Sequence, residues 1–207
     1  MIQLYDYILS GSCYKVRLFL SMIGLEFETI PVDYYPGGEH KMPDFLEINP
    51  LGQIPVLRDG DLTLRDAQAM LVYLAGKYDA GRTWYPEDAE TQGQIAMWLS
   101  FAGSEIMNSS AARLHDMLFY DFDIDKVRSA ARAAFRILDD HLTDREIDGT
   151  DWIVGNTPTI ADIACFPYVA LSGDGGISLD DYNAIRRWIA RLKKISGFVI
   201  MPGIHAN

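Results

Sequence analysis

The order of apolar and polar positions divides the chain into two parts. Over roughly the first eighty residues, short apolar runs typical of strands alternate with segments whose apolar residues recur every three or four positions. These patterns predict strands over 2–6 and 26–32, helices over 12–23, 43–48 and 66–78, and a two-stranded hairpin between the last two helices. The predicted order in this part of the chain is therefore βαβαββα.

The rest of the chain shows helical periodicity only. Apolar residues fall at the i, i+3, i+4 and i+7 positions that share one face of a helix. These stripes contain Ile95, Trp98, Leu99, Ala102 and Ile106, then Val127, Ala131, Ala134, Phe135, Leu138 and Leu142, and finally Ile185, Trp188, Ile189 and Leu192. We interpret the stripes as core positions rather than as ligand contacts.

The change of pattern predicts two domains. The order βαβαββα is typical of an α+β, thioredoxin-like domain, which we assign to residues 1–80. A linker around 79–86 would join it to an all-α helical-bundle domain over 87–207. In this second domain, Thr159 and Asp162 stand three positions apart before an apolar run, which is a capping-box pattern. We therefore expect Asp162 to act in folding rather than in catalysis.

Charge and composition narrow the classes of partner. The formal net charge of −11 argues against binding to nucleic acid or to an anionic membrane, because both need a basic protein surface. The chain starts directly with a predicted strand, and no apolar run approaches the roughly eighteen residues of a membrane span. We expect a cytoplasmic protein that binds neither nucleic acid nor membrane.

The two cysteines predict neither a disulfide framework nor a metal site. Cys13 and Cys165 lie far apart in the sequence and in different predicted domains. They lack the CxxC spacing of a dithiol redox site and the clustering of a zinc site. We expect no metal to be needed.

A proline stands at an unusual place in the predicted hairpin. The segment 49–53 breaks a short helix, and Ile54-Pro55 then opens an apolar, strand-like run. Proline cannot donate to a sheet, so Pro55 is predicted at an edge, at a bulge or in a cis turn. A cis bond would leave the backbone N–H and C=O of Ile54 free to pair with the backbone of a ligand.

An acidic residue begins the helix that follows the hairpin. Asp66 precedes an apolar-periodic run that starts at Ala69. Aspartate is a preferred N-cap residue, so an ordinary capping role is the simplest interpretation from local sequence alone.

With these elements in this order, the chain resembles the cytosolic glutathione transferases, most clearly over its first eighty or so residues. In that family the residue before a cis-proline pairs with the cysteinyl backbone of glutathione, which implies such a role for Ile54 before Pro55. An acid–serine pair at the start of the third helix holds the γ-glutamyl end, and here it reads Asp66-Ala67. The hydroxyl is missing, so the γ-glutamyl carboxylate would rely on the N–H of Ala67 at the helix N-terminus.

Hydroxyl groups and a thiol cluster between the first strand and the first helix. A free thiol has a pKa near 8.5, and lowering it by about two units needs roughly 2.7 kcal/mol of preferential stabilisation of the thiolate. A hydroxyl donor and helix N-terminal amides can supply this together. From the residues alone, Ser10, Ser12 and Cys13 are candidates, and either serine could merely cap the helix. Tyr5 and Tyr7 offer alternative hydroxyls, although the strand spacing of Tyr5 favours a core position for it.

The resemblance orders these candidates. Ser10 falls where serine-type members of the zeta and phi classes carry the hydroxyl that holds the glutathione sulfur. Ser12 corresponds to the position where beta-like bacterial members place a cysteine. The pair His40-Lys41 resembles the basic pair that meets the glycyl carboxylate in phi-like members, and Gln53 could add an amide hydrogen bond.

The resemblance implies a transferase that conjugates glutathione, its co-substrate, to small apolar electrophiles, in detoxification. The electrophile would lie between the domains, and the family is usually dimeric through its third and fourth helices, which implies a homodimer. Candidate electrophile contacts are Trp98, Phe101, Met107, Arg113 and Phe166. Two alternatives stay open. One is a glutathione-dependent thiol–disulfide oxidoreductase or peroxidase that uses Cys13 or bound glutathione. The other is a non-catalytic binding protein, which the alanine at position 67 in place of the family's serine suggests.

Overall fold

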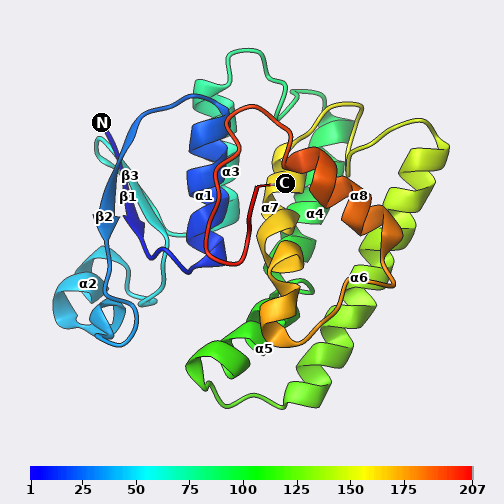
Figure 1. Ribbon diagram of the computed structural model, residues 1–207. Helices are drawn as coiled ribbons and strands as arrows, with labels where there is room; N and C mark the ends of the chain where they lie inside the picture. The colour runs from blue at the N-terminus through cyan, green and yellow to red at the C-terminus, as the bar shows by residue number, and fades with distance from the viewer. Residues whose placement is uncertain (207) are drawn as a thin grey trace.

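The computed structural model describes residues 1–206 and shows a sheet-containing domain beside a helical domain (Figure 1). The first domain contains β1 (Ile2–Asp6), α1 (Gly11–Met22), β2 (Phe27–Pro31), α2 (Pro43–Ile48), β3 (Val56–Asp59), β4 (Leu62–Leu64) and α3 (Ala67–Tyr78). The strand order is β2-β1-β3-β4, with β1 parallel to β2 and antiparallel to β3. The predicted order βαβαββα and the thioredoxin-like fold are confirmed.

The first helix begins one residue earlier than its apolar pattern predicts. Ser10 has extended backbone, and its Oγ accepts a hydrogen bond from the N–H of Cys13, so the helix starts at Gly11. The helix also ends one residue earlier than predicted, at Met22, and Gly24 just beyond it adopts φ +66°, a conformation that glycine reaches without steric cost. The cap therefore fixes the backbone between β1 and α1.

The second domain consists of helices. They are α4 (Ala89–Gly103), α5 (Met107–Leu118), α6 (Ile124–Ile147), α7 (Ile160–Ala170) and α8 (Asn183–Leu192). Most of the predicted stripe residues are buried, but Ile106 lies in the turn after α4 rather than on that helix, because α4 ends at Gly103. No helix within residues 1–206 is both long enough and apolar enough to cross a membrane.

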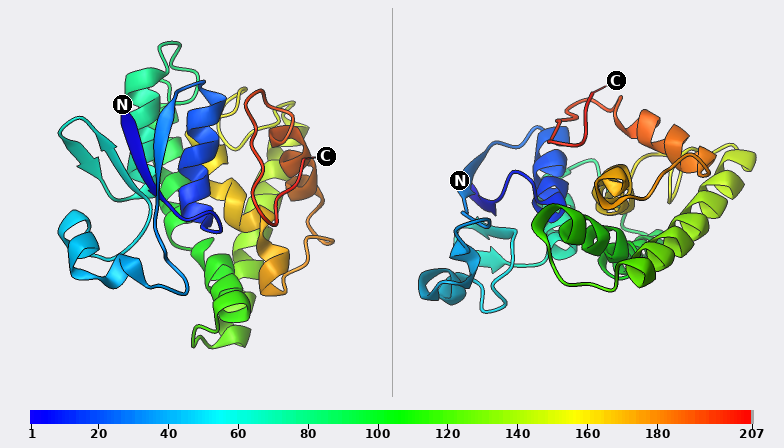
Figure 2. Two further views of the ribbon diagram at one scale, coloured as in Figure 1. Left: turned by 60° about the vertical axis from the view of Figure 1, so that its left-hand side comes forward. Right: turned by 60° about the horizontal axis from the view of Figure 1, so that its bottom comes forward.

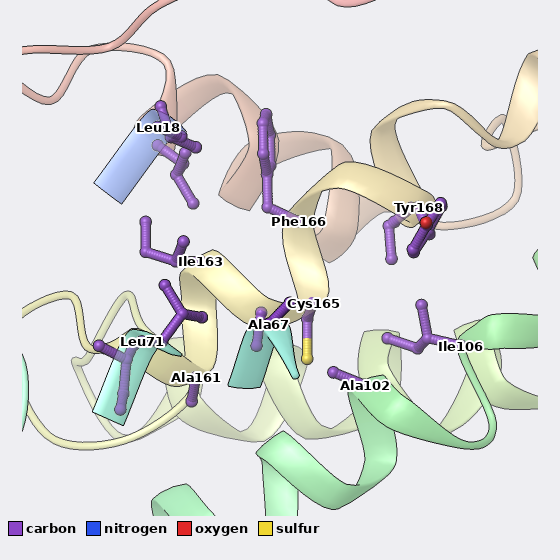
Figure 3. Close-up of a cluster of buried hydrophobic side chains, with 14 of the residues drawn as sticks. Leu18, Ala67, Leu71, Ala102, Ile106, Ala161, Ile163, Cys165, Phe166 and Tyr168 are labelled. Carbon is purple, nitrogen blue, oxygen red and sulfur yellow. The ribbon is translucent and has the colours of Figure 1, made fainter. Parts of the chain in front are cut away.

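Helix α7 lies at the centre of the molecule. It packs against α1 and α3 of the first domain and against α4 of the second, and Figure 2 shows it nearly end-on among the other helices. Side chains from both domains meet on its surface (Figure 3). The labelled residues of this cluster are Leu18, Ala67, Leu71, Ala102, Ile106, Ala161, Ile163, Cys165, Phe166 and Tyr168. A single buried helix thus joins the two domains.

The predicted capping box starts this helix. The side chains of Thr159 and Asp162 each accept a backbone N–H of the box, and the Asp162 carboxylate also accepts the indole N–H of Trp188 at 2.9 Å. Burial raises the pKa of Asp162, against the effect of these hydrogen bonds. Asp162 is fully buried and acts in folding, in line with its predicted role.

Candidate functional site

A cavity of about 410 Å³ lies between the two domains. Its lining residues from the first domain are Tyr7, Leu9, Ser10, Gly11, Ser12, Tyr34, Gln53, Ile54, Pro55, Arg65, Asp66, Ala67 and Gln68. The helical domain contributes Gly103, Met107, Ser110, Arg113, Leu114, Met117, Leu118 and Tyr168. The cavity therefore collects most of the predicted site residues.

Ser10 combines two of the roles considered for it. Its Oγ accepts the N–H of Cys13 at 3.2 Å and caps α1. Capping uses a lone pair of the oxygen, so the hydroxyl proton remains able to donate to another group. Ser10 also lines the cavity, at the positive end of the α1 dipole. A hydroxyl and the helix N-terminus are therefore directed at the same region.

Ser12 has a partner from the helical domain. Its Oγ lies 2.9 Å from the hydroxyl oxygen of Tyr168, and its backbone N–H donates to the same oxygen at 3.1 Å. Both residues line the cavity. Sequence reasoning missed Tyr168, which belongs to a helix that is buried along most of its length; its distance of 156 positions from Ser12 leaves no local signal.

Two arginines hold the loop between β1 and α1. Arg17 donates to the carbonyl oxygen of Ile8 at 3.0 Å and forms an ion pair with Asp6. From the helical domain, Nη1 of Arg113 donates to the carbonyl oxygen of Leu9 at 2.8 Å. The sequence suggested Arg113 only as an electrophile contact. It lines the cavity, and it also anchors this loop. The loop that carries Ser10 is thus fixed from both domains.

The start of α3 and the turn before β3 form another wall of the cavity. Asp66 caps α3, and its Oδ1 accepts the N–H of Ala69 at 2.8 Å. Ala67 is the first residue of the helix, and the Ile54–Pro55 peptide bond is cis. The residues that line this wall are Gln53, Ile54, Pro55, Asp66 and Ala67. They present backbone amides and one carboxylate to a ligand.

His40 and Lys41 do not themselves line the cavity, although His40 contacts the lining residue Tyr34. The ring of His40 stacks on Tyr34 at a centroid distance of 3.9 Å, and the lysine ammonium donates to the carbonyl oxygen of Gly52 at 2.9 Å. Within residues 1–206 the buried Nδ1 of His40 has no hydrogen-bond partner. Burial, and secondly the charge of Lys41, lower the pKa of His40, so the imidazole is neutral at pH 7. The pair supports the wall through Tyr34 and Gly52.

Both cysteine thiols are fully buried. Burial, and secondly the charge of Asp6, raise the pKa of Cys13 to about 12. Burial likewise raises the pKa of Cys165 well above its usual range. A thiol must ionise to act as a nucleophile, so this environment disfavours the redox alternative that used Cys13.

The side of the cavity formed by α5 is mainly apolar. The α5 residues that line it are the apolar Met107, Leu114, Met117 and Leu118 and the polar Ser110 and Arg113. Of the five predicted electrophile contacts, Met107 and Arg113 are lining residues, whereas Trp98 and Phe166 are buried in the core and Phe101 packs edge-on against Trp98. Helical spacing alone could not separate these positions.

Comparison with known proteins identifies relatives along the whole chain. A family model described as the N-terminal domain of glutathione S-transferase matches residues 9–77, and one for the C-terminal domain matches residues 121–191. Glutathione S-transferase theta-1 from Rattus norvegicus is 25% identical, over 95% of this chain and 84% of the relative. Glutathione S-transferase 2 from Anopheles gambiae is 29% identical, over 97% of this chain and 93% of the relative.

Solved structures give the same grouping. A possible glutathione S-transferase from Rhodopseudomonas palustris superposes with a TM-score of 0.87, at 26% identity and 97% coverage of each chain. The structure of Ure2p in complex with glutathione superposes with a TM-score of 0.85, at 25% identity and 95% coverage of each chain.

Proposed function

The chain belongs to the glutathione S-transferase family, and from this premise we propose that its cavity binds glutathione, that Ser10 holds the sulfur as a thiolate, and that the thiolate attacks a small apolar electrophile. The transferase function and the use of glutathione as co-substrate follow from the family. The observation that carries the mechanism is the hydroxyl of Ser10 on the cavity wall, which caps α1 and still has its proton to donate.

The wall near α3 would hold the peptide part of glutathione. The cysteinyl backbone would pair with the backbone of Ile54, while the carboxylate of Asp66 would accept the γ-glutamyl ammonium. The γ-glutamyl carboxylate would receive the N–H of Ala67, which stands at a helix N-terminus and attracts an anion. Gln53, with His40 and Lys41 behind it, would serve the glycyl end. This orientation directs the cysteine side chain toward Ser10.

Activation of the sulfur requires preferential stabilisation of its anion. The thiol proton leaves to solvent, and the resulting thiolate accepts the Ser10 O–H and faces the N-terminal amides of α1. A pKa two units lower corresponds to roughly 2.7 kcal/mol, within reach of a charge-assisted hydrogen bond and a helix dipole acting together. The sulfur lone pair then forms the bond to the electrophilic carbon, while the cavity holds both reactants in place.

The apolar side of the cavity favours small apolar electrophiles. This surface is formed by Met107, Leu114, Met117 and Leu118. Two of these four side chains are methionines, which are flexible and polarizable. We propose that residues 1–80 bind glutathione and that the helical domain, 87–207, receives the electrophile. A homodimer, a cytoplasmic location and a role in detoxification remain predictions from the resemblance.

An ultraviolet difference titration with glutathione near pH 7 tests the proposal. Wild-type protein should show a saturable thiolate absorbance, and Ser10→Ala should bind glutathione with similar affinity while losing most of that absorbance. Equal thiolate signals in the two proteins would exclude Ser10 as the sulfur ligand. Binding without thiolate in wild type would favour a binding protein, the alternative raised by Ala67.

A further inference from the structure

We propose that Tyr168 belongs to the sulfur site: with Ser12 it forms a hydroxyl pair that directs one proton into the cavity, where it stabilises the glutathione thiolate alongside Ser10. This inference rests on the proposed function. It adds a residue of the helical domain to a site predicted entirely from the first domain. The contact between Tyr168 and Ser12, at 2.9 Å, is the observation that carries it.

The number of protons in the pair supports this role. The two hydroxyls carry two protons, and the contact between their oxygens uses one of them. The backbone N–H of Ser12 donates to the Tyr168 oxygen at 3.1 Å, so this oxygen already serves as an acceptor. Whichever hydroxyl donates within the pair, the other keeps a free proton. Since both residues line the cavity, that proton is available to an anion there.

The hydroxyl pair and Ser10 lie at the same end of α1, its N-terminus. Ser12 lies in the first turn of α1, two residues after the Ser10 cap. The positive end of the helix dipole therefore acts on a region that both sets of hydroxyls border. A thiolate can accept more than one hydrogen bond, so Ser10 and the pair do not compete for it.

Gly11 allows the tyrosine ring to come this close. A Cβ atom at residue 11 would lie 2.6 Å from Cε1 of Tyr168, and this atom belongs to a ring packed in the interior. The hydroxyl of Ser109 also holds the helix backbone, because it donates to the carbonyl oxygen of Tyr168 at 2.7 Å. The hydroxyl of Tyr168 therefore occupies a defined place at the N-terminus of α1.

A buried lysine lies behind the ring. Nζ of Lys15 is 5.2 Å from the centroid of the Tyr168 ring, and within residues 1–206 it has no hydrogen-bond partner. Burial lowers the pKa of Lys15 to about 8, an effect that the negative charge of Asp66 opposes. When protonated, this amine favours negative charge in this part of the molecule.

The decisive variant is Ser12→Ala/Tyr168→Phe, which keeps the ring and removes both hydroxyls, because Tyr168→Phe alone would leave the Ser12 proton free to reach the cavity. We expect the pKa of bound glutathione to rise by about 0.5–1 unit, which lowers the thiolate fraction at pH 7 about 1.5- to 3-fold when the starting pKa is about two units below 8.5. The dissociation constant of glutathione should change less than about twofold, because the pair contacts the sulfur and not the peptide backbone. The measurement is the thiolate absorbance of the complex as a function of pH.

Tyr182→Phe is the matched control. Tyr182 is 6% exposed, like Tyr168, and its hydroxyl donates to the carbonyl oxygen of Arg132 at 3.2 Å, among residues that do not line the cavity. This variant should retain the wild-type thiol pKa. The single variant Ser12→Ala leaves the Tyr168 hydroxyl and its proton in place, so it should raise the thiol pKa by less than the double variant does.

The outcomes separate this inference from the proposed function. A thiol pKa that is unchanged in the double variant, or equal in the double variant and Ser12→Ala, with the signal lost in Ser10→Ala, would overturn the role of Tyr168 and leave the transferase mechanism intact. Absence of a thiolate signal in wild-type protein would overturn the mechanism itself, and the hydroxyl pair with it. A rise in the double variant that exceeds the rise in Ser12→Ala, with none in Tyr182→Phe, supports the inference.

Discussion

Nη1 of Arg113 lies 2.8 Å from the carbonyl oxygen of Leu9, so an arginine of α5 binds the residue immediately before Ser10. Nε of the same guanidinium pairs with Asp174 at 2.9 Å, and the residue is 8% exposed. One planar group therefore connects the loop after β1 with the helical domain through two directed bonds.

Replacing Arg113 with lysine should slow conjugation. A single ammonium cannot reproduce both directed bonds, so the backbone at Ser10 would lose part of its support. We expect kcat to fall about 3- to 30-fold, corresponding to roughly 0.7–2 kcal/mol of transition-state stabilisation. Arg128→Lys is the control, because Arg128 also joins a carbonyl oxygen to a carboxylate but does not line the cavity. Equal kcat in both variants and wild type would show that the loop needs no such support.

Ser10→Ala tests the proposed thiolate ligand by its effect on rate. The pKa of bound thiol should rise and conjugation should slow by about 10- to 1000-fold, if the hydroxyl supplies roughly 1.4–4 kcal/mol. The change also removes a helix cap, which costs about 1 kcal/mol of stability. Asp88→Ala removes a comparable cap, from α4, at a residue outside the cavity lining. It should lower the melting temperature similarly and leave the thiol pKa as in wild type.

Ala67→Ser would restore the hydroxyl that the resemblance leads one to expect. Ala67 is the first residue of α3 and lines the cavity, so a serine hydroxyl there could add a hydrogen bond to the γ-glutamyl carboxylate. We expect the dissociation constant of glutathione, measured by calorimetry, to fall about 3- to 10-fold, as for one additional hydrogen bond of about 1 kcal/mol. An unchanged constant would mean that the backbone N–H already suffices.

Cys13→Ala distinguishes the transferase from the oxidoreductase. The thiol is fully buried and its pKa is raised to about 12, so it is protonated at neutral pH. The contact of residue 13 with Ser10 is through its backbone N–H, which the substitution keeps. We expect conjugation to remain within about twofold of wild type, because no reacting group is removed. Loss of all activity in the folded variant would revive the mechanism that uses Cys13.

Asp59 predicts how stability depends on pH. Its carboxylate accepts hydrogen bonds from Lys77, Tyr78 and Tyr73, which lower its pKa to about 2. Since the unfolded pKa is near 3.9, this stabilisation is fully present above about pH 4 and is lost as the pH falls towards 2. Asp59→Asn should reduce the free energy of unfolding by about 1–2 kcal/mol at pH 7. Urea titrations should show this difference shrinking as the pH falls from 4 to 2; a constant difference would contradict the assignment.

The sequence predicted the elements whose signals are local. Pro55, the Asp66 cap and the capping box of Thr159 and Asp162 each depend on residues within a few positions of one another, and the structure has all three. The end of α4 was misplaced because apolar spacing continues through Ile106, although the chain turns after Gly103. Periodicity records which residues are buried, but it does not record where a helix stops.

The site itself was only half visible in the sequence. The resemblance located the wall made by the first domain, whereas Tyr168 and the anchoring role of Arg113 depend on how the domains pack. Tyr168 lies on α7, where neighbours on every side are buried, so apolar pattern alone gives its hydroxyl no distinguishing mark. Only the distance to Ser12 in three dimensions reveals it.

Helix α7 also determines when the site can form during synthesis. The hydroxyl partner of Ser12 is Tyr168, so a ribosome must add at least 168 of the 207 residues before this contact can form. The apolar faces of α1 and α3 that pack on α7 stay uncovered until this helix has been synthesised. A nascent chain that has released only its first domain therefore exposes these faces. A fragment ending before α7 would carry Ser12 without its Tyr168 partner.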